Sequence, residues 1–402
     1  MFSNLLHIIS VNKRLSSIIL LINTFVWLSW ISLILREVVT MAAFPDNEVF
    51  IVWSVNFCGA FVSILVGALL AAKFNQTHFL LFWILLGVTA SLIPIFMDIT
   101  TINNVIIMSC LFSVSIGLGL PVCMANFAKY TVVENRARLS GVMFLLIMIL
   151  EAFLFTLITQ NIITSLLAST CWRGFALACL FAKDSNEKRR FCVSFISIVK
   201  EHSFISYIVP WTMFSLVNYL SASIGINVHG EEFMYYLMFT ENILIGIFAI
   251  IGGFLCDTIG RKRITICGFI LLGLGYAILG IYPLSMICLL FYTVVDGIAW
   301  GIFYVVFFFT IWGDLAHEKS SETYYALGSL PYLLSNFLRL TIGPVIANII
   351  SAYAIFSFAA FFLFLAVIPL MFAPETLPEK KLRERELRQY IEKAKKIKEK
   401  YV

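Results

Sequence analysis

Apolar runs of about 20 residues recur along almost the whole chain, and this feature constrains the fold more than any other. A helix that crosses a hydrocarbon core about 30 Å thick needs roughly that many apolar residues. Hydrophobic residues make up 61% of the chain and charged residues only 13%, which is more apolar surface than a water-soluble domain can bury. The sequence therefore predicts an all-α integral membrane protein.

Twelve runs are long enough to be predicted as transmembrane helices. Their approximate bounds are Ser16–Leu35, Val49–Ala72, Phe79–Met97, Asn104–Phe127, Ser140–Gln160, Ile163–Ala182, Phe204–Ser223, Met234–Cys256, Ile264–Tyr282, Ser285–Trp312, Tyr324–Asn348 and Ser351–Phe372. Trp172 and Arg173 interrupt the sixth run, and two interpretations stay open. Either a short helix leaves Arg173 at the outer surface, which we favour, or the helix begins near Ile163 and buries Arg173.

Lysine and arginine in the short loops set the orientation, because translocation retains positive charge on the cytoplasmic side. The basic loop residues gather on one side of the predicted helices: Lys13, Arg14, Lys73, Lys129, Arg136, Arg138, Lys183, Lys188, Arg189, Arg190, Arg261, Lys262, Arg263 and Lys319. The opposite loops carry acids such as Glu48 and Glu231, with Arg36 as the basic exception. We therefore expect a multi-pass protein of the plasma membrane with both termini in the cytoplasm and an uncleaved first helix.

The spans divide six and six around a polar stretch. This division predicts an N-terminal six-helix bundle over residues 1–182, a cytoplasmic linker over 183–203, a C-terminal six-helix bundle over 204–373 and a charged cytoplasmic helix over 374–402. When the first half of the sequence is aligned with the second half, Gly67 falls opposite Gly253 and Ala71 opposite Asp257. The first half therefore keeps the spacing of these two positions but lacks the charge of Asp257. We therefore expect two bundles related by a parallel pseudo-repeat.

The most specific motif is a charged turn between the eighth and ninth runs, in which Gly253 is followed by Asp257 and then by Gly260-Arg261-Lys262. Gly253 permits a close approach to a neighbouring helix, and Gly260 permits a tight turn. Asp257 can cap the N-terminus of an adjacent helix. The pattern resembles the cytoplasmic signature loop of major facilitator superfamily transporters. The alternative is a loop that only fixes topology through its positive charge.

The resemblance implies specific contacts across the two halves. Asp257 would cap the fifth helix, which should start near Ser140, and Arg261 would pair with Asp314 at the end of the tenth helix. In this superfamily such contacts join the halves only when the cytoplasmic side is closed, so they would act as a gate.

Two weaker likenesses agree with this one. Residues 133–141 look like the superfamily's charged loop between the fourth and fifth helices, and Pro374-Glu375-Thr376-Leu377-Pro378 is similar to the ending of its sugar and metabolite porters. The resemblance implies a monomeric secondary active transporter that moves a small organic solute by alternating access, with protons as the favoured energy source. A facilitative uniporter, a non-transporting solute sensor and a lipid-acting membrane enzyme are the alternatives.

Four charged residues lie deep in the predicted spans, namely Glu151, Glu241, Asp296 and Arg339. A charge at a helix centre costs about 2.5–3.5 kcal/mol, so it usually faces a cavity or a partner. Asp296 and Arg339 lie at one depth on neighbouring antiparallel helices, which predicts an ion pair. In the family fold the second, fifth, eighth and eleventh helices form the interface between halves. Glu151 and Glu241 would then face each other, and either could carry a proton or hold a purely structural hydrogen bond.

Polar and aromatic residues that could line a cavity are Asn56, Trp211, Asn218, Tyr292, Trp300, Tyr304 and Asn336. Helix packing is the competing interpretation for each of them. The substrate stays open between a modestly polar metabolite, an amphipathic compound and, because of Arg339, an organic anion.

The sequence has no Walker loop, no Gly-x-Gly-x-x-Gly after a strand and no soluble domain. Its nine cysteines and five histidines are scattered without metal-ligand spacing. We therefore expect a protein that is not an enzyme, with no cofactor, no metal and no nucleic-acid partner, whose partners are a solute, a proton and the lipid bilayer.

Overall fold

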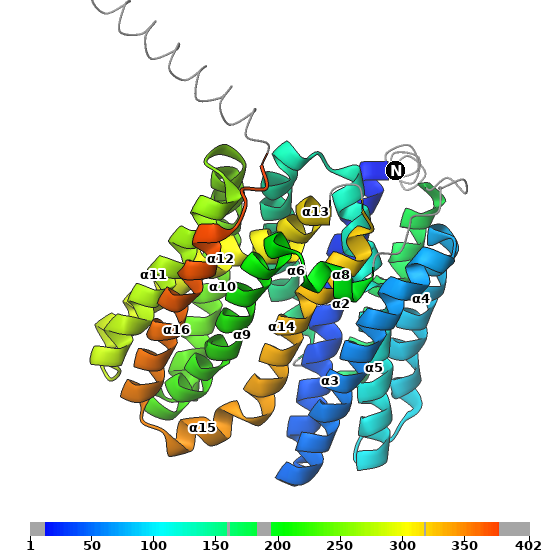
Figure 1. The fold of residues 1–402 in the computed structure, drawn as a ribbon. Helices are drawn as coiled ribbons and strands as arrows, with labels where there is room; N and C mark the ends of the chain where they lie inside the picture. Colours follow the sequence, from blue (N-terminus) through cyan, green and yellow to red (C-terminus); the bar gives the residue numbers. More distant parts are fainter. Residues whose placement is uncertain (1–12, 159–160, 183–193, 317–318, 378–402) are drawn as a thin grey trace, which may run out of the picture.

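The computed structural model describes residues 13–158, 161–182, 194–316 and 319–377, and every regular element in these ranges is a helix. Helices suit a bilayer because they satisfy every backbone hydrogen bond internally. The start of the first described helix and the end of the last one lie on one side of the molecule (Figure 1), which we call the terminal side. The opposite side is the distal side. The predicted tail after Leu377 and the linker up to residue 193 lie outside the described residues.

The first half of the chain forms six spans. They are α2 (Lys13–Ala42), α3 (Asp46–Lys73), α4 (Gln76–Leu92) with η1 (Ile93–Phe96), α5 (Ile102–Tyr130), α6 (Arg136–Ile158), and α7 (Ile162–Phe175) with η3 (Ala176–Ala182), and the short η2 (Val133–Asn135) precedes α6. Asparagine side chains cap two of these helices. Asn75 accepts a hydrogen bond from the N–H of Thr77 at the start of α4, and Asn161 accepts one from Ile163 at the start of α7.

The second half forms six further spans. Its elements are α8 (Phe195–Val199), α9 (His202–His229), α10 (Glu231–Thr258), α11 (Arg261–Ile281), α12 (Met286–Phe303), the π-helix η4 (Tyr304–Thr310), α13 (Ile311–Ala316), α14 (Ser321–Thr341), α15 (Gly343–Ile349) and α16 (Ala352–Phe372). The tenth span consists of α12, η4 and α13. The eleventh span bends by 55° between α14 and α15, where Pro344 in the first turn of α15 lacks a backbone N–H.

Nine helices of the described ranges are long and apolar enough to cross a membrane, and the bent pair α14–α15 makes ten. Helices α6 and α9, with 23 and 28 residues, bring the number to twelve. The predicted fold class, twelve transmembrane helices in two six-helix bundles, is confirmed.

The two halves meet along α6 and α10 and along α3 and α14. These are the fifth, eighth, second and eleventh spans, as the family resemblance implied. Glycines allow α6 and α10 to approach closely, because a Cβ on Gly141 would strike the carbonyl oxygen of Ala249 and one on Gly253 would strike that of Ala137. The expected role of Gly253 in close helix packing is therefore confirmed.

The favoured interpretation of Arg173 is wrong, because this side chain is fully buried within the first half. Its guanidinium group lies 4.6 Å from the ring of Trp27 and 4.1 Å from the ring of Trp83. Its Nη1 atom also donates a hydrogen bond of 3.2 Å to Asn23 Oδ1. Cation–π attraction is strongest for a desolvated cation, so the two indole rings offset part of the cost of burying this charge.

Candidate functional site

Asp257 joins the two halves on the terminal side. Its carboxylate lies at the end of α10 and accepts hydrogen bonds from the backbone N–H groups of Ala137 (3.4 Å) and Arg138 (2.8 Å). These are the first residues of α6, where unpaired N–H groups and the positive end of the helix dipole favour a carboxylate. The expected capping contact is present, and it lies before Ser140 because α6 already begins at Arg136.

Arg261 is fully buried at the start of α11. Its Nη1 pairs with Asp314 of α13, and its Nη2 donates a hydrogen bond of 2.5 Å to the carbonyl oxygen of Val133 in the first half. Asp314 also pairs with Arg136 of α6. The implied pair of Arg261 and Asp314 is therefore present. Arg136 is a partner that sequence reasoning missed, although it lies within the recognised segment 133–141, where it is the first residue of α6.

We call four of these residues the latch: Arg136, Asp257, Arg261 and Asp314. Their side chains are at most 5% exposed. Removing one partner of a buried ion pair costs about 3–5 kcal/mol, because it leaves a charge without compensation. The latch thus holds the two halves together on the terminal side.

The segment after α16 packs against the latch. Gly260 adopts a φ of 120° ahead of α11, a backbone conformation that favours glycine. The Glu375 carboxylate then caps α11 by accepting hydrogen bonds from the N–H groups of Arg261 (2.9 Å) and Lys262 (3.1 Å). Thr376 donates a 3.2 Å hydrogen bond to Asp314. Sequence reasoning recognised the Pro-Glu-Thr segment without assigning it this capping role.

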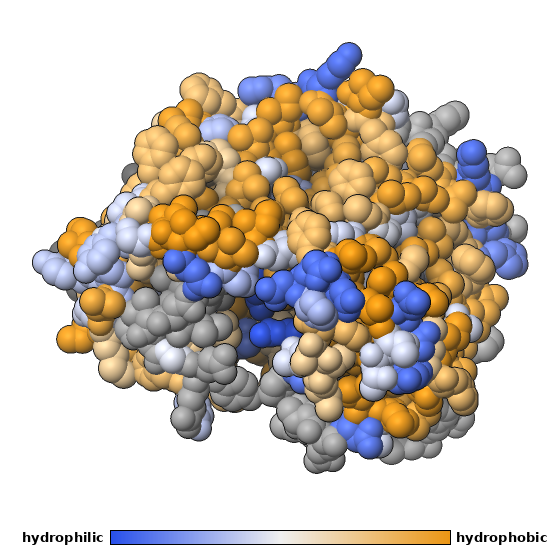
Figure 2. Space-filling view, turned by 90° about the horizontal axis from the view of Figure 1, so that it is seen from below, coloured by the Kyte–Doolittle hydropathy of each residue, from blue (hydrophilic) through white to orange (hydrophobic). Residues whose placement is uncertain are grey.

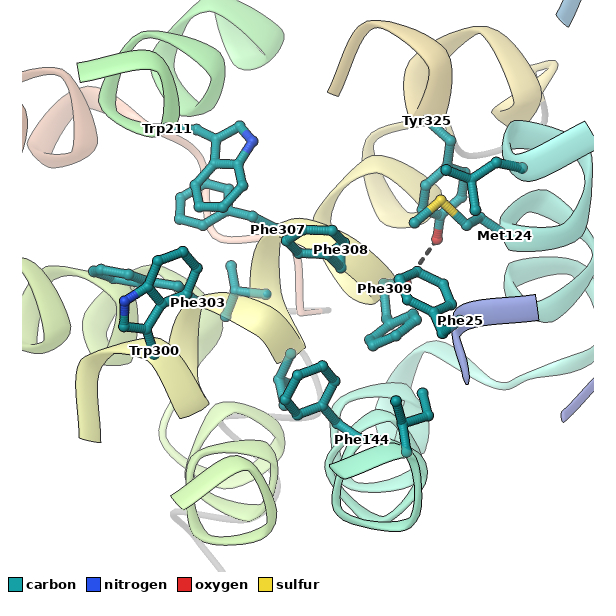
Figure 3. Close-up of a cluster of buried hydrophobic side chains, with 14 of the residues drawn as sticks. Phe25, Met124, Phe144, Trp211, Trp300, Phe303, Phe307, Phe308, Phe309 and Tyr325 are labelled. Carbon is teal, nitrogen blue, oxygen red and sulfur yellow. Dashed lines mark hydrogen bonds between the residues drawn. The ribbon is translucent and has the colours of Figure 1, made fainter. Parts of the chain in front are cut away.

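An aromatic cluster lies next to the latch along the tenth span. Its members, shown in Figure 3, come from both halves: Phe25, Phe144, Trp211, Phe307, Phe308 and Phe309. Phe307 stacks on Trp211 with ring centroids 4.7 Å apart, while Phe309 contacts Phe25 at 5.0 Å. The cluster fills the space between the halves with apolar side chains, so the closed region extends from the latch into the middle of the protein.

The distal side is hollowed. Figure 2 shows this face with a recess near its centre, in which hydrophilic residues gather among mostly hydrophobic surroundings. In this structure the space between the halves is therefore closed on the terminal side and open on the distal side.

Glu241 and Asp296 come together in the second half. Glu241 lies on α10 and Asp296 on α12, and their carboxyl groups are within hydrogen-bonding reach of each other. Two carboxyl groups can form a hydrogen bond only if one of them carries a proton, because a carboxylate has acceptors alone. Asp296 is buried, whereas Glu241 is half-buried. The pair is therefore a site that can hold a proton.

Glu151 lies on α6, on the other side of the interface. It accepts a 2.5 Å hydrogen bond from Ser29 Oγ of α2. On the tenth and eleventh spans, the rings of Tyr304 and Tyr332 lie with their centroids 6.5 Å apart. Ser29 and Tyr332 were missed by sequence reasoning, and no signal in the sequence distinguishes them from other polar helix residues.

The predicted ion pair of Asp296 and Arg339 does not form in the described part of the chain. Asp296 turns toward Glu241, and the neighbouring Gly297 packs on Leu244 of α10. Arg339 is exposed near the end of α14 and forms no ion pair with another described residue. Depth along a helix follows from counting residues, but rotation about the helix axis is set by packing, and it turns Asp296 toward Glu241 rather than toward Arg339.

Of the seven residues given as cavity-lining candidates, Trp211 and Tyr304 stack on other aromatic rings, and the other five divide between packing and exposed positions. Tyr292 is buried and donates a 3.0 Å hydrogen bond to Tyr276, and Trp300 is buried with its ring 4.7 Å from that of Tyr304. The amide of Asn56 reaches the carbonyl oxygen of a neighbouring helix. Asn218 is half-buried and Asn336 is exposed. No group of three potential metal ligands occurs among the described residues.

Comparison with known proteins identifies the fold. Residues 202–400 match the family model described as Major Facilitator Superfamily. A search of curated proteins finds no match. The structure is similar to the proton:xylose symporter XylE bound to 6-bromo-6-deoxy-D-glucose, with a TM-score of 0.69, 12% identity, and 91% of this chain and 96% of that chain covered.

Two further solved structures have the same fold. A variant of the E. coli fucose:proton symporter FucP has a TM-score of 0.73 and 10% identity, with 90% of this chain and 100% of that chain covered. The human organic anion transporter MFSD10 (TETRAN) has a TM-score of 0.65 and 11% identity, with 89% and 99% covered. At these identities the likeness is one of fold.

Proposed function

Since this chain belongs to the major facilitator superfamily, it is a multi-pass membrane transporter, and we propose that it moves a small organic solute by proton-coupled alternating access. The observation that carries the proposal is the asymmetry between its two sides. The buried latch closes the terminal side, while a hydrophilic recess is open on the distal side. A solute bound in the recess reaches the other side when the latch separates and the two bundles rock.

We further propose an orientation for this cycle. Basic residues gather in the loops of the terminal side, which therefore faces the cytoplasm, and the recess faces outward at the plasma membrane. Residues 1–182 and 204–373 would be the two rocking bundles.

The pair of Glu241 and Asp296 supports proton coupling. A shared proton leaves the pair with one negative charge, and a second proton neutralises it. Glu151 offers a further carboxylate on the opposite bundle, joined to Ser29. Two of the structurally similar proteins are named as proton symporters, which agrees with this assignment. Proton and solute would cross together because both lie between the same moving helices.

Proteoliposomes that contain the purified full chain test the proposal. A pH-sensitive dye records proton movement while sugars, amino acids, carboxylates and cationic drugs are added in turn. We expect a solute-dependent pH change that is lost in Glu241→Gln and in Asp296→Asn, while counterflow of the solute persists. Asp46→Asn, which changes an exposed carboxylate at the start of α3, is the matched control and should keep the pH change.

Each other outcome points to an alternative. Solute uptake without proton movement in the wild-type protein would make it a uniporter. Solute binding without counterflow would make it a sensor. A pH change that survives in both carboxyl variants would contradict the role of Glu241 and Asp296.

A further inference from the structure

Glu151 is a deep acid without a charged partner. The acids of the latch pair with arginines, whereas Glu151 forms no ion pair with any described residue. Its side chain has one hydrogen bond in the described ranges, the 2.5 Å bond that Ser29 Oγ donates to its Oε1. A carboxylate in the middle of a transmembrane helix is costly unless a partner compensates its charge, and one hydroxyl group does so only in part.

The side chain of Glu151 faces the space between the bundles. The lipid-facing residues of α6 are between 44% and 56% exposed, and they are Val142, Leu146 and Ile149. At about 100° per residue, Glu151 lies opposite this stripe. Phe144, two turns earlier on the face of Glu151, is buried and stacks on Tyr304 of the second half with ring centroids 4.3 Å apart. Glu151 is nevertheless partly exposed, so its exposed part faces inward rather than toward lipid.

Glu151 and Ser29 lie on the distal side of the aromatic cluster. Helices α6 and α2 both begin on the terminal side, and Glu151 follows Phe144 by two turns, or about 11 Å. Ser29 likewise follows Phe25 by one turn of α2, and Phe25 contacts Phe309 at 5.0 Å. Because the cluster fills the space on the terminal side, the two polar residues lie at the floor of the recess seen in Figure 2.

We infer that the solute is a small organic cation whose ammonium group is bound by Glu151 and Ser29 at this floor. An ammonium group has N–H donors and no acceptor, so it can donate to the carboxylate and to the hydroxyl oxygen at once. Charge-assisted hydrogen bonds of this kind are roughly twice as strong as neutral ones. An anion would be repelled by Glu151, and a neutral solute would leave its charge uncompensated. This inference rests on the proposed function, since it assigns a substrate class to the same recess.

The assignment gives the solute and the proton separate sites. Glu151 and Ser29 belong to the first bundle and hold the cation, while Glu241 and Asp296 belong to the second bundle and hold the proton. Closing the recess removes these carboxyl groups from water, and a buried charge without a partner is strongly destabilising. Closure is therefore favoured when the ammonium group neutralises Glu151 and protons neutralise the pair, so both ligands cross together.

Calorimetry on the purified full chain in nanodiscs tests the assignment. The probes are butylammonium, its neutral analogue butyramide and its anionic analogue butyrate, which share one short apolar chain. Titration into empty nanodiscs records the heat that lipid alone contributes. We expect butylammonium to bind, and the two analogues to bind at least about tenfold more weakly because neither can pair with Glu151.

Variants of the two residues test the contacts. Glu151→Gln keeps the size of the side chain and removes its charge, and it should weaken butylammonium binding about 10- to 100-fold. Glu151→Asp keeps the charge and should retain more of the affinity. Ser29→Ala should weaken binding about 2- to 10-fold, as the loss of one hydrogen bond does. Glu48→Gln, at a partly exposed carboxylate in the first turn of α3, is the matched control and should bind as the wild-type protein does.

The outcomes separate this inference from the proposed function. Equal binding of butyramide or butyrate, unchanged butylammonium affinity in Glu151→Gln, or no butylammonium binding at millimolar concentration would each overturn the substrate class. Unchanged affinity in Ser29→Ala would remove Ser29 from the site. A neutral or anionic solute that drives proton movement in proteoliposomes would leave the transporter intact and remove only the cation. Butylammonium binding that depends on Glu151, without counterflow, would keep the cation site and refute transport.

Discussion

Asp314→Asn should open the terminal side of the protein. Asp314 lies between two buried guanidinium groups, those of Arg136 and Arg261, and it accepts a hydrogen bond from Thr376 as well. The substitution keeps the shape of the side chain and removes its charge. Two guanidinium groups then face each other across the interface, and Arg136 loses the carboxylate with which it pairs.

The size of the effect follows from the burial of these groups. Removing one partner of a buried ion pair costs about 3–5 kcal/mol. When the terminal side is open the same groups lie in water, where an ion pair contributes only about 0–1 kcal/mol. The closed state therefore loses about 3 kcal/mol relative to the open state. At a factor of ten for every 1.4 kcal/mol, the ratio of closed to open molecules should fall roughly 100-fold.

Distance measurements between two nitroxide labels can record this change. Val132 and Ile259 are exposed and flank the latch, Val132 in the first half and Ile259 in the second. Labels at these positions, in a chain whose nine native cysteines are replaced, should give one short distance in the wild-type background. Asp314→Asn should add a longer distance and make it the major component.

An ion pair outside the interface between the bundles provides the control. Lys319 pairs with Glu201 at 2.6 Å on the terminal side, with both partners partly exposed and both in the second half. Lys319→Gln should leave the label distances unchanged, because an exposed pair contributes little. If Asp314→Asn gave the wild-type distance distribution, the latch would not be what holds the terminal side closed.

Three further predictions concern packing and charge. Gly253→Ala places a methyl group against the carbonyl oxygen of Ala137, so it should lengthen the same label distance, whereas Gly174→Ala, with no atom within 4 Å of the new Cβ, should not. Arg173→Lys loses the stacking of a planar guanidinium between two tryptophan rings, and a fluorescence-monitored melt should show a loss of about 2 kcal/mol; an unchanged midpoint would contradict this role. The hydrogen bond from Lys319 to Glu201 raises the pKa of Lys319, so its stabilising effect is present at neutral pH and is lost as the pH rises through that raised value. The difference in melting temperature between the wild-type protein and Lys319→Gln should therefore vanish in strongly alkaline buffer, and a constant difference would argue against it.

The spans and the latch could be predicted because each depends on local sequence. A run of apolar residues determines whether a helix crosses the bilayer, and the spacing from Gly253 to Arg261 places its charges at one helix end. The partner Asp314 followed from the family resemblance, because it is an acid at the end of the tenth span. Arg136 was visible as a charge, but nothing local shows that it turns inward rather than toward water.

The deep charges were predicted less well, because their partners depend on how helices rotate against one another. Asp296 and Arg339 have the depth of an ion pair, yet the packing of Gly297 on α10 turns Asp296 toward Glu241. Arg173 was expected at the surface because an unpaired cation is costly inside a bundle. Its two indole partners come from α2 and α4, far away in the sequence, and only the folded chain brings them together.

The π-helix in the tenth span makes the length of this segment as important as its composition. Before η4, Trp300 is buried against other aromatic rings, whereas after it Asp314 pairs with Arg136 and Arg261 of the latch. Each residue of an α-helix turns the chain by about 100°, so the deletion or insertion of a single residue within Tyr304–Thr310 would swing Asp314 away from both arginines. Descendants of this sequence can therefore exchange one apolar side chain for another in η4, but a change in the number of residues there would break the ion pairs of Asp314 with Arg136 and Arg261.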